Sequence, residues 1–496
     1  MRYFIGVDLG TSSVKSLLMD ENGQTLGIAS REYDIIKQNS SWAEQKINFL
    51  WRKTSETLSE LASKFNSLKN SITAMSFSGQ MHGLIALDKN FTPVRNAIIW
   101  ADQRSRDSIN YIERTAPDYR EKIFNSISTG FLAASLIWIR DNEPENYEKI
   151  KYVMLPKDYI RFKICGEIGT EISDASGTGL FDVIKHEWAY DVIAKLNLDP
   201  KIFVPCKNSS DLAGKLNKVC ARLTGLPEGI SIIYGGGDTL VQAIGNGARE
   251  NILISNIGTA SQLLCAIHKP MHDKDFRTNT FCHVIQNQWL LMGANLTGGA
   301  ALKWLKKVLG IKDYETMTNL ALESEPGAKD LLFLPYLNGE RTPYNDPQAR
   351  AIFFGLNMNH GQKEFIRATM EGIIFAQRET LEIFRGMGLN FSQVIVSGGG
   401  AKSAAFREII ANVLKCIVIT NKISEQGCIG AAILAAVGSG TFRTIYEACD
   451  KIIKFGDSIA IPDPKKMSLY DEIFARFQKI YPANKNLFPR VPVVGQ

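Results

Sequence analysis

The chain carries one pattern twice, as YFIGVDLGTSS at residues 3–13 and as ILISNIGTAS at residues 252–261. Each copy is a short apolar strand that runs into a Gly-Thr turn and then into a second apolar run. Glycine permits the tight backbone of such a turn, and the N–H groups of the turn and the threonine hydroxyl can bind phosphate oxygens. Two copies therefore predict two similar domains that hold one nucleotide from both sides.

The two copies differ where Asp8 in the first is replaced by Asn256 in the second. An aspartate at the end of a strand beside a phosphate-binding turn can help to hold hydrated Mg²⁺. The alternative for the first copy alone is a plain β-turn with an exposed aspartate, which the presence of a second copy disfavours. The candidate phosphate-binding residues are Gly10, Thr11, Gly258 and Thr259.

Length and composition predict a two-domain globular protein. The chain has 496 residues, of which 45% are hydrophobic and 22% are charged. A chain of this length exceeds one hydrophobic core, and we place a boundary near residues 245–250, just beyond the glycine run at 235–237, which gives domains at 1–246 and 247–496. The formal charge is +6, but the basic residues are scattered, which argues against a nucleic-acid partner.

The distribution of cysteines and apolar residues predicts a cytoplasmic protein. The eight cysteines include no Cys-x-x-Cys pair, which is typical of reduced, buried thiols. The longest apolar stretch, residues 428–437, is too short for a membrane span and predicts a buried helix. Because a strand is predicted at the very start, no signal peptide is expected. A further group of residues resembles zinc ligands but has the wrong spacing, and we interpret it as a structural or substrate-side loop: Cys265, His268, His272, Cys282 and His283.

Strand, glycine turn and helix follow one another along the chain, which predicts an α/β fold. Apolar spacing predicts strands at residues 3–8, 14–19, 72–78 and 393–397, and helices at 48–65, 133–140, 157–162, 301–308, 364–384 and 403–414. This alternation places the candidate chemistry on turns that follow strands.

Asp238 leaves a glycine run, residues 235–237, and opens a helical stretch. Phosphoryl transfer to a hydroxyl needs a carboxylate that can accept the proton and orient the oxygen, and Asp238 is placed to do so. The alternative is that Asp238 only caps the helix, which aspartate does well, although capping does not exclude catalysis.

A second glycine run, Gly398, Gly399 and Gly400 followed by Ala401, connects a predicted strand to a helix. A backbone without side chains lets a flat base and its ribose lie against the turn, with the N-terminus of the helix behind it. By itself this run is more typical of a permissive loop, so its interpretation as a nucleotide site depends on the other motifs.

Met81 and His82 lie between two glycines at the end of a predicted strand. The glycines favour an exposed loop, and we expect these two side chains to contact a polyol, although a lone histidine is more often structural. Trp100 lies in a similar loop and is either an aromatic wall of the site or a buried residue at a helix start.

These motifs resemble those of the FGGY family of carbohydrate kinases, and within it the xylulokinases. The resemblance runs nearly from end to end and includes SGQMHG at 78–83, WADQR at 100–104, LPKDY at 155–159, SDASGT at 173–178, GGGD at 235–238, LPYLNGERTP at 334–343 and the segment 351–371. It implies two duplicated domains of actin-like, RNase H-like fold, with ATP and sugar in a central cleft.

The resemblance also implies roles for single residues. Asp238 matches the catalytic base, and Met81 and His82 match the pair that touches the ketose. Asp8 matches the aspartate that organises Mg²⁺, with Asp238 as the second candidate beside the metal. The remaining matches are to nucleotide contacts, at Thr11, Gly258, Thr259, Gly299, Gly398, Gly399, Gly400 and Ala401.

The implied activity is ATP-dependent phosphorylation of a ketopentose, with D-xylulose as the first candidate and D-xylulose 5-phosphate as its product. Two departures from the family pattern, Ser135 in place of a lysine and Thr239 in place of an asparagine, weaken the choice of sugar. Ribulose, L-xylulose, glycerol and a tetritol therefore stay open as substrates. The resemblance also leaves a homodimer open as the assembly. A different class, a nucleotide-switched interaction protein related to actin or chaperone ATPases, would leave Met81 and His82 without a purpose.

Overall fold

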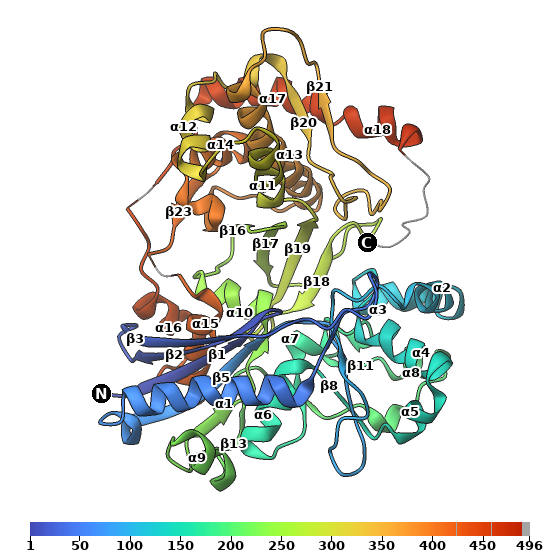
Figure 1. Cartoon of the computed structure of the whole chain (residues 1–496), viewed down its shortest axis with the longest axis vertical. Coiled ribbons are helices and arrows are strands. Elements are labelled where there is room, and N and C mark those ends of the chain that lie inside the picture. Colours follow the sequence, from blue (N-terminus) through green and yellow to red (C-terminus); the bar gives the residue numbers. More distant parts are fainter. Residues whose placement is uncertain (423, 458, 489–496) are drawn as a thin grey trace.

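Two large mixed β-sheets, one formed by each half of the chain, dominate the architecture (Figure 1). The computed structural model describes residues 1–422, 424–457 and 459–488. Helices cover both sheets, so the predicted α/β class with two sheet-containing domains is confirmed. We propose that the domains divide at residues 246 and 247, as the sequence indicates.

The first sheet has the strand order β13-β14-β5-β1-β2-β3, and β15 pairs with β5 beyond the end of β14. Its strands are β1 (Tyr3–Leu9), β2 (Ser13–Asp20), β3 (Thr25–Glu32), β5 (Ile72–Gly79), β13 (Leu212–Lys215), β14 (Ser231–Ile233) and β15 (Gly236–Gly237). The second sheet has the order β18-β19-β17-β16-β22-β23. Its strands are β16 (Ile252–Ile257), β17 (Ser261–Ile267), β18 (Asn279–Cys282), β19 (Trp289–Asn295), β22 (Gln393–Gly398) and β23 (Ile417–Thr420).

The duplication seen in the sequence extends to the pairing of individual residues. Asp8 on β1 lies beside Ser78 on the parallel strand β5. Asn256 on β16 lies beside Ser397 on the parallel strand β22. In both sheets the first strand forms an antiparallel hairpin with the next, across the Gly-Thr turn. The two copies of the pattern therefore occupy equivalent places in two equivalent sheets.

The longer helices of the first half are α1 (Ile47–Lys64), α2 (Arg106–Thr115), α4 (Leu132–Asn142), α6 (Pro156–Cys165), α9 (Lys218–Thr224) and α10 (Asp238–Gly245). Those of the second half are α11 (Gly299–Val308), α12 (Tyr314–Leu322), α13 (Gln362–Gly386), α14 (Ala404–Leu414), α15 (Gln426–Gly438), α16 (Ile445–Ile452) and α17 (Pro464–Phe477). Every strand and helix predicted from the sequence is present, with its ends within three residues of the prediction.

One helix of the second half lies on the first sheet. Helix α15 packs against β1, β5 and β2 and pairs with α10. Figure 1 shows this arrangement, since α15 and α16, near the red end of the colour scale, lie beside the blue strands β1 to β3. The apolar stretch that forms α15 is buried, as predicted, but the sequence did not indicate which sheet would bury it.

Glycines make this close packing possible. A Cβ atom added to Gly6 on β1 would lie 1.9 Å from the carbonyl oxygen of Cys428 on α15. Between the two helices, a Cβ on Gly245 would lie 2.0 Å from the oxygen of Gln426, and one on Gly430 would lie 2.1 Å from the oxygen of Val241. Backbone therefore lies directly on backbone at these contacts, and α10 and α15 join the cores of both sheets.

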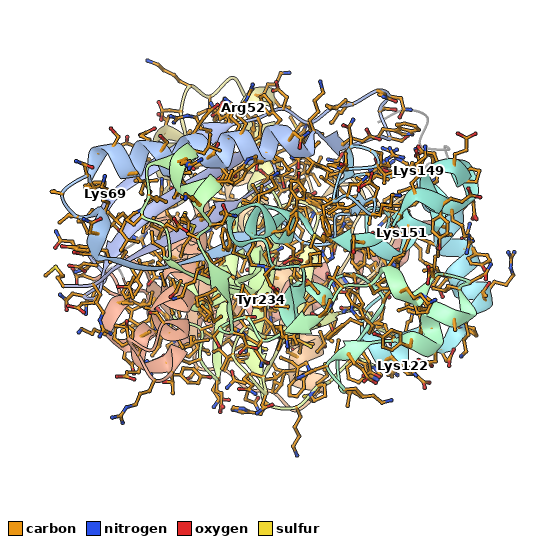
Figure 2. The ribbon with its side chains drawn as sticks, turned by 90° about the horizontal axis from the view of Figure 1, so that it is seen from below. Arg52, Lys69, Lys122, Lys149, Lys151 and Tyr234 are labelled. Atoms are coloured by element: carbon orange, nitrogen blue, oxygen red, sulfur yellow. The ribbon has the colours of Figure 1, made fainter. Side chains whose placement is uncertain are left out.

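Some basic side chains, such as Lys157 and Arg161, are buried, while others lie on the surface. Figure 2 shows the lower face of the molecule, on which Arg52, Lys69 and Lys122 lie at separate edges. Among the described residues, no helix combines the length and the apolarity that a membrane crossing would need.

Gly430→Ala should destabilise the protein, because its new methyl group would meet the Val241 carbonyl oxygen at 2.1 Å. Overpacking of this kind costs roughly 1–3 kcal/mol, which thermal or urea denaturation would measure. Gly386→Ala, at the end of α13, is the matched control because nothing lies within 4 Å of the added Cβ. Equal stability of the two variants would contradict the close contact between α10 and α15.

Candidate active site

Three strands of the first sheet bring the predicted catalytic and sugar-binding residues to one edge. Strand β5 is parallel to both β1 and β15, so the carboxyl ends of the three strands lie together. Asp8 is near the end of β1, Met81 and His82 follow β5, and Asp238 follows β15. This edge is where α/β sheets place ligands.

Asp8 is partly buried between the first sheet and the start of α15. Its Oδ1 accepts a hydrogen bond from the Ser78 hydroxyl at 2.6 Å. A Cβ on Gly427, in the first turn of α15, would lie 2.7 Å from the Asp8 carboxyl carbon. Burial raises the pKa of Asp8, while the hydrogen bond from Ser78 and the positive charge of Lys15 oppose that rise.

Asp238 is the first residue of α10, and Gly237 is the N-cap. Its Oδ1 accepts the backbone N–H of Thr239 at 2.6 Å and the Thr239 hydroxyl at 3.2 Å. Gly237 therefore occupies the N-cap position, while the Asp238 carboxylate satisfies an N–H of the first turn. Burial, together with the negative charge of nearby Asp8, raises the pKa of Asp238 to about 7.

The loop that carries Met81 and His82 is not exposed, which corrects the prediction from its flanking glycines. Met81 is only 4% exposed and packs on Gly237, where an added Cβ would lie 2.8 Å from the Met81 Cγ. His82 is half-buried, and its ring stacks on that of Phe131 with centroids 4.0 Å apart. The glycines serve close packing of the backbone here, not exposure.

His82 is held in one orientation and one protonation state. Its φ angle is 72°, a conformation that a non-glycine residue adopts only when the surroundings fix it. The Nδ1 lies 2.6 Å from the Gly177 carbonyl oxygen, so Nδ1 carries the proton and Nε2 is left as an acceptor. Burial, with a smaller contribution from the charge of Arg341, lowers the pKa of His82 to about 4. A neutral histidine of this kind can accept a hydrogen bond from a hydroxyl.

Trp100 joins the sugar side of the site to the first phosphate turn. Its side chain is 41% exposed, so the buried alternative is wrong. The indole Nε1 donates to the Thr11 Oγ1 at 2.8 Å, which leaves the hydroxyl proton of Thr11 free to bond an incoming oxygen. The Gly10 N–H donates to the Ser13 carbonyl oxygen within the turn, so this amide is already used.

The second turn is exposed and supports the start of α11. The N–H of Gly299 donates to the Gly258 carbonyl oxygen at 2.7 Å. The N–H of Gly298 donates to the Thr259 carbonyl oxygen at 2.9 Å. A Cβ on Gly299 would lie 2.8 Å from the Gly258 oxygen, so glycine is needed for this approach. The exposed threonine hydroxyl is the side-chain donor that this turn offers to a ligand.

The glycine run at residues 398–401 begins at the end of β22 and lies against the end of the neighbouring strand β16. Gly398 has a φ of 75°, and a Cβ there would lie 2.5 Å from the Ile257 carbonyl oxygen. Gly399 is exposed, Gly400 is buried against Ile257, and Ala401 is partly buried. This run, Gly258 and Gly299 therefore gather at one edge of the second sheet, as the nucleotide interpretation requires.

Several residues near the site were missed by the sequence reasoning. Arg341 from the second half lies close enough to His82 for its charge to lower the pKa of that histidine. Its neighbour Glu340 is buried, and its Oε1 accepts the N–H groups of Leu296 and Arg341, each at 2.7 Å. Both belong to the family-like stretch 334–343, whose specific sequence was the available signal.

An ion pair connects the two halves beside Asp8. The Lys15 Nζ lies 2.6 Å from the Glu425 Oε2, immediately before α15. Lys15 is also the β2 partner of Asp8 across the first hairpin. No short motif marks this pair, because its members are far apart in the sequence.

The two departures from the family pattern lie in different surroundings. Thr239 contacts the Asp238 carboxylate directly, as described above. Ser135 lies on α4 with its side chain fully buried, and its hydroxyl has no hydrogen-bond partner among the described residues. Thr239 is therefore the departure that can change the immediate environment of the candidate base.

The described residues contain no group of three or more His, Cys, Asp or Glu side chains arranged to hold a metal ion, including the group from Cys265 to His283. A pair of carboxylates nevertheless fits Mg²⁺ delivered with a nucleotide, because that ion keeps several waters and uses one or two protein carboxylates. Asp8, near the end of β1, and Asp238, just after β15, are two such carboxylates at one edge of the sheet, because both strands pair in parallel with β5.

Comparison with known proteins agrees with this arrangement. The N-terminal domain of the FGGY family of carbohydrate kinases matches residues 3–245, and its C-terminal domain matches residues 253–439. A protein named xylulose kinase from Bacillus subtilis (strain 168) is 34% identical over 490 residues, covering 98% of each chain.

Solved structures share the whole fold. A crystal structure of a xyloylose kinase from Brucella ovis has a TM-score of 0.93 at 29% identity and covers 98% of this chain and 100% of its own. A gluconate kinase from Lactobacillus acidophilus also has a TM-score of 0.93, at 25% identity over 97% of this chain and 98% of its own. The predicted actin-like architecture is therefore confirmed, while the fold alone does not select the sugar.

Asp238→Asn should stabilise the protein at high pH. The folded-state pKa of about 7 exceeds the ordinary value of 3.8, so stability falls as the pH rises between these two values. Above pH 8 the wild-type Asp238 is ionised beside the negative charge of Asp8, whereas the asparagine of the variant is neutral. We therefore expect the variant to melt a few degrees higher than the wild type. The difference should vanish below the ordinary pKa of aspartate. If the melting temperatures of the variant and the wild type differed by the same amount at every pH, the ionised carboxylate of Asp238 would not be destabilising.

Proposed function

Since this chain belongs to the FGGY family of carbohydrate kinases, we propose that it transfers the terminal phosphoryl group of ATP to D-xylulose, giving D-xylulose 5-phosphate and ADP. The support for this sugar is the 34% identity to a protein named xylulose kinase over almost the whole chain. We further propose a cytoplasmic location, which the eight free cysteines support.

The observation that carries the proposal is the meeting of Asp8, His82 and Asp238 at the carboxyl ends of three neighbouring strands. At this edge Asp238 is the candidate base, His82 is the polar group for a sugar hydroxyl, and Asp8 is the carboxylate beside a phosphate turn. Met81 supplies an apolar surface between them, because it packs on Gly237. Trp100, which is partly exposed and bonded to Thr11, borders the same edge.

Asp238 is the proposed general base. It accepts the proton of the terminal sugar hydroxyl while that oxygen forms a bond to the γ-phosphorus and the bond from phosphorus to the ADP oxygen breaks. A base works best when its pKa lies near the working pH, and the pKa of Asp238 is about 7. The neutral His82 accepts a hydrogen bond from another hydroxyl through Nε2 and so orients the sugar.

The nucleotide is proposed to lie between the two Gly-Thr turns. Thr11 and Thr259 donate their hydroxyl protons to phosphate oxygens, while Gly299 and the run from Gly398 to Ala401 leave room for ribose and base. Asp8 and Asp238 would hold Mg²⁺ that arrives with the nucleotide, and the ion would neutralise charge on the phosphates. Positive charge there also relieves the repulsion between the two carboxylates.

A nucleotide-switched interaction protein is the second class to test. The duplicated turns alone permit it, but the fixed orientation of His82 beside Asp238 favours a substrate in the site. The other pentuloses and polyols stay as alternatives within the kinase class. A gluconate kinase of the same fold adds an aldonate to the sugars that deserve a test.

We expect ATP consumption to depend on sugar. Coupled ADP detection with D-xylulose, L-xylulose, ribulose, glycerol, a tetritol and gluconate should give the highest kcat/KM for D-xylulose. ADP formation at the same rate without any sugar would favour the switch, and a strong preference for another sugar would replace D-xylulose within the proposal.

Asp238→Ala should abolish sugar phosphorylation, because the attacking hydroxyl would lose its proton acceptor. Loss of a general base lowers kcat by roughly 10²–10⁴-fold, while calorimetric titration with ADP should give a Kd close to that of the wild type. Phosphorylation of D-xylulose at nearly the wild-type rate by this variant would reject Asp238 as the base.

A further inference from the structure

A short buried segment, Ser173 to Gly177, lies between the parts of the site, and its Gly177 carbonyl oxygen orients His82. It begins within helix α7 (Ile172–Ala175), which contacts both β15 and β18. Resting on the function proposed above, we propose that Ser173 is a positioning residue for phosphoryl transfer, whose hydroxyl fixes the backbone that carries Asp238.

The contact between Ser173 and the backbone is direct. The Gly237 N–H, immediately before Asp238, donates to the Ser173 Oγ at 3.1 Å. A Cβ on Gly236 would lie 3.0 Å from the same oxygen, so this backbone rests on the hydroxyl. Strand β15 contains only Gly236 and Gly237, and its ladder with β5 is correspondingly short. Ser173 therefore supplies an anchor that the sheet itself does not provide.

Ser173 is itself held by a buried charged cluster. The Glu171 carboxylate accepts the Ser173 N–H at 2.8 Å and the Asp174 N–H at 2.9 Å. The Lys157 Nζ lies 3.2 Å from Glu171 and from Asp174, and 2.7 Å from Asp158. All four charged side chains are fully buried. These ion pairs tie the segment to Lys157 on α6, because breaking them would leave buried charges without partners.

The same segment also holds the sugar side of the site. The Gly177 carbonyl oxygen accepts the bond from the His82 Nδ1 at 2.6 Å. The Ser176 Oγ accepts the N–H of Cys282, on β18 of the second half, at 3.1 Å. One segment therefore sets the placement of Asp238 relative to His82, and ties both to the other half of the chain.

Ser173→Ala tests this role. The Gly237 N–H would lose its acceptor, so the backbone that carries Asp238 would shift. Displacements of about 1 Å at a reacting group can cost up to about 10²-fold in rate, and we expect kcat to fall at least tenfold. The KM for ATP should stay within about twofold.

Ser16→Ala is the matched control. The Ser16 hydroxyl lies 2.7 Å from the Thr57 hydroxyl and is equally buried, but it bonds neither to Gly237 nor to the charged cluster around Glu171. We expect this variant to keep a kcat within about twofold of the wild type. If Ser173→Ala does not fold, Ser173→Cys takes its place, with the same direction of change in kcat.

Two results would overturn the inference. One is a wild-type kcat in the Ser173 variant, and the other is an equal fall of kcat in the Ser16 control. An active Asp238→Ala enzyme would instead reject the proposed base. An inactive Asp238→Ala enzyme beside an unaffected Ser173 variant would reject only the positioning role.

Discussion

Backbone-to-backbone packing of α10 and α15 is the constraint on which the rest of this structure depends. Gly245 and Gly430 allow the two helices to touch, and Gly6 allows α15 to reach the first sheet. The first sheet is thus completed by a helix from the other half. Because α10 begins at Asp238 and α15 begins beside Asp8, the same contact places both candidate carboxylates.

The two carboxylates illustrate how the fold tolerates unfavourable charge at a site. Asp8 accepts a hydrogen bond from Ser78 and lies against the first turn of α15, where the helix dipole favours negative charge. Asp238 accepts two hydrogen bonds from Thr239, yet the pKa of its carboxyl is still raised to about 7. Electrostatic strain of this kind is typical of sites that await a cation or a proton.

The sequence was sufficient wherever the signal was local. The repeated strand-turn pattern predicted two equivalent sheets, and the pairing of Asp8 with Ser78 and of Asn256 with Ser397 follows that repeat. The motif residues also gather at the predicted strand ends. Their roles in catalysis, however, stay proposals, because position alone does not establish chemistry.

The sequence was insufficient wherever the partner is distant along the chain. The glycines around His82 suggested exposure, but its ring is covered by Phe131 from another element. The apolar run of α15 indicated that the helix is buried but not which of the two sheets it packs against. Arg341 influences His82 across the two halves, and Ser173 contacts Gly237 through a single hydroxyl. Such contacts depend on how the elements pack, which periodicity and spacing do not contain.

The place of α15 also sets the order in which this protein can mature during its synthesis. A ribosome adds about 5–20 residues per second, so the roughly 190 residues between Asn246 and Gly438 take roughly 10–40 s to appear. Throughout that interval the nascent first sheet lacks the helix that covers Phe4 and Leu17. Its apolar face is then open to chaperones and to aggregation, until the emerging second half closes it.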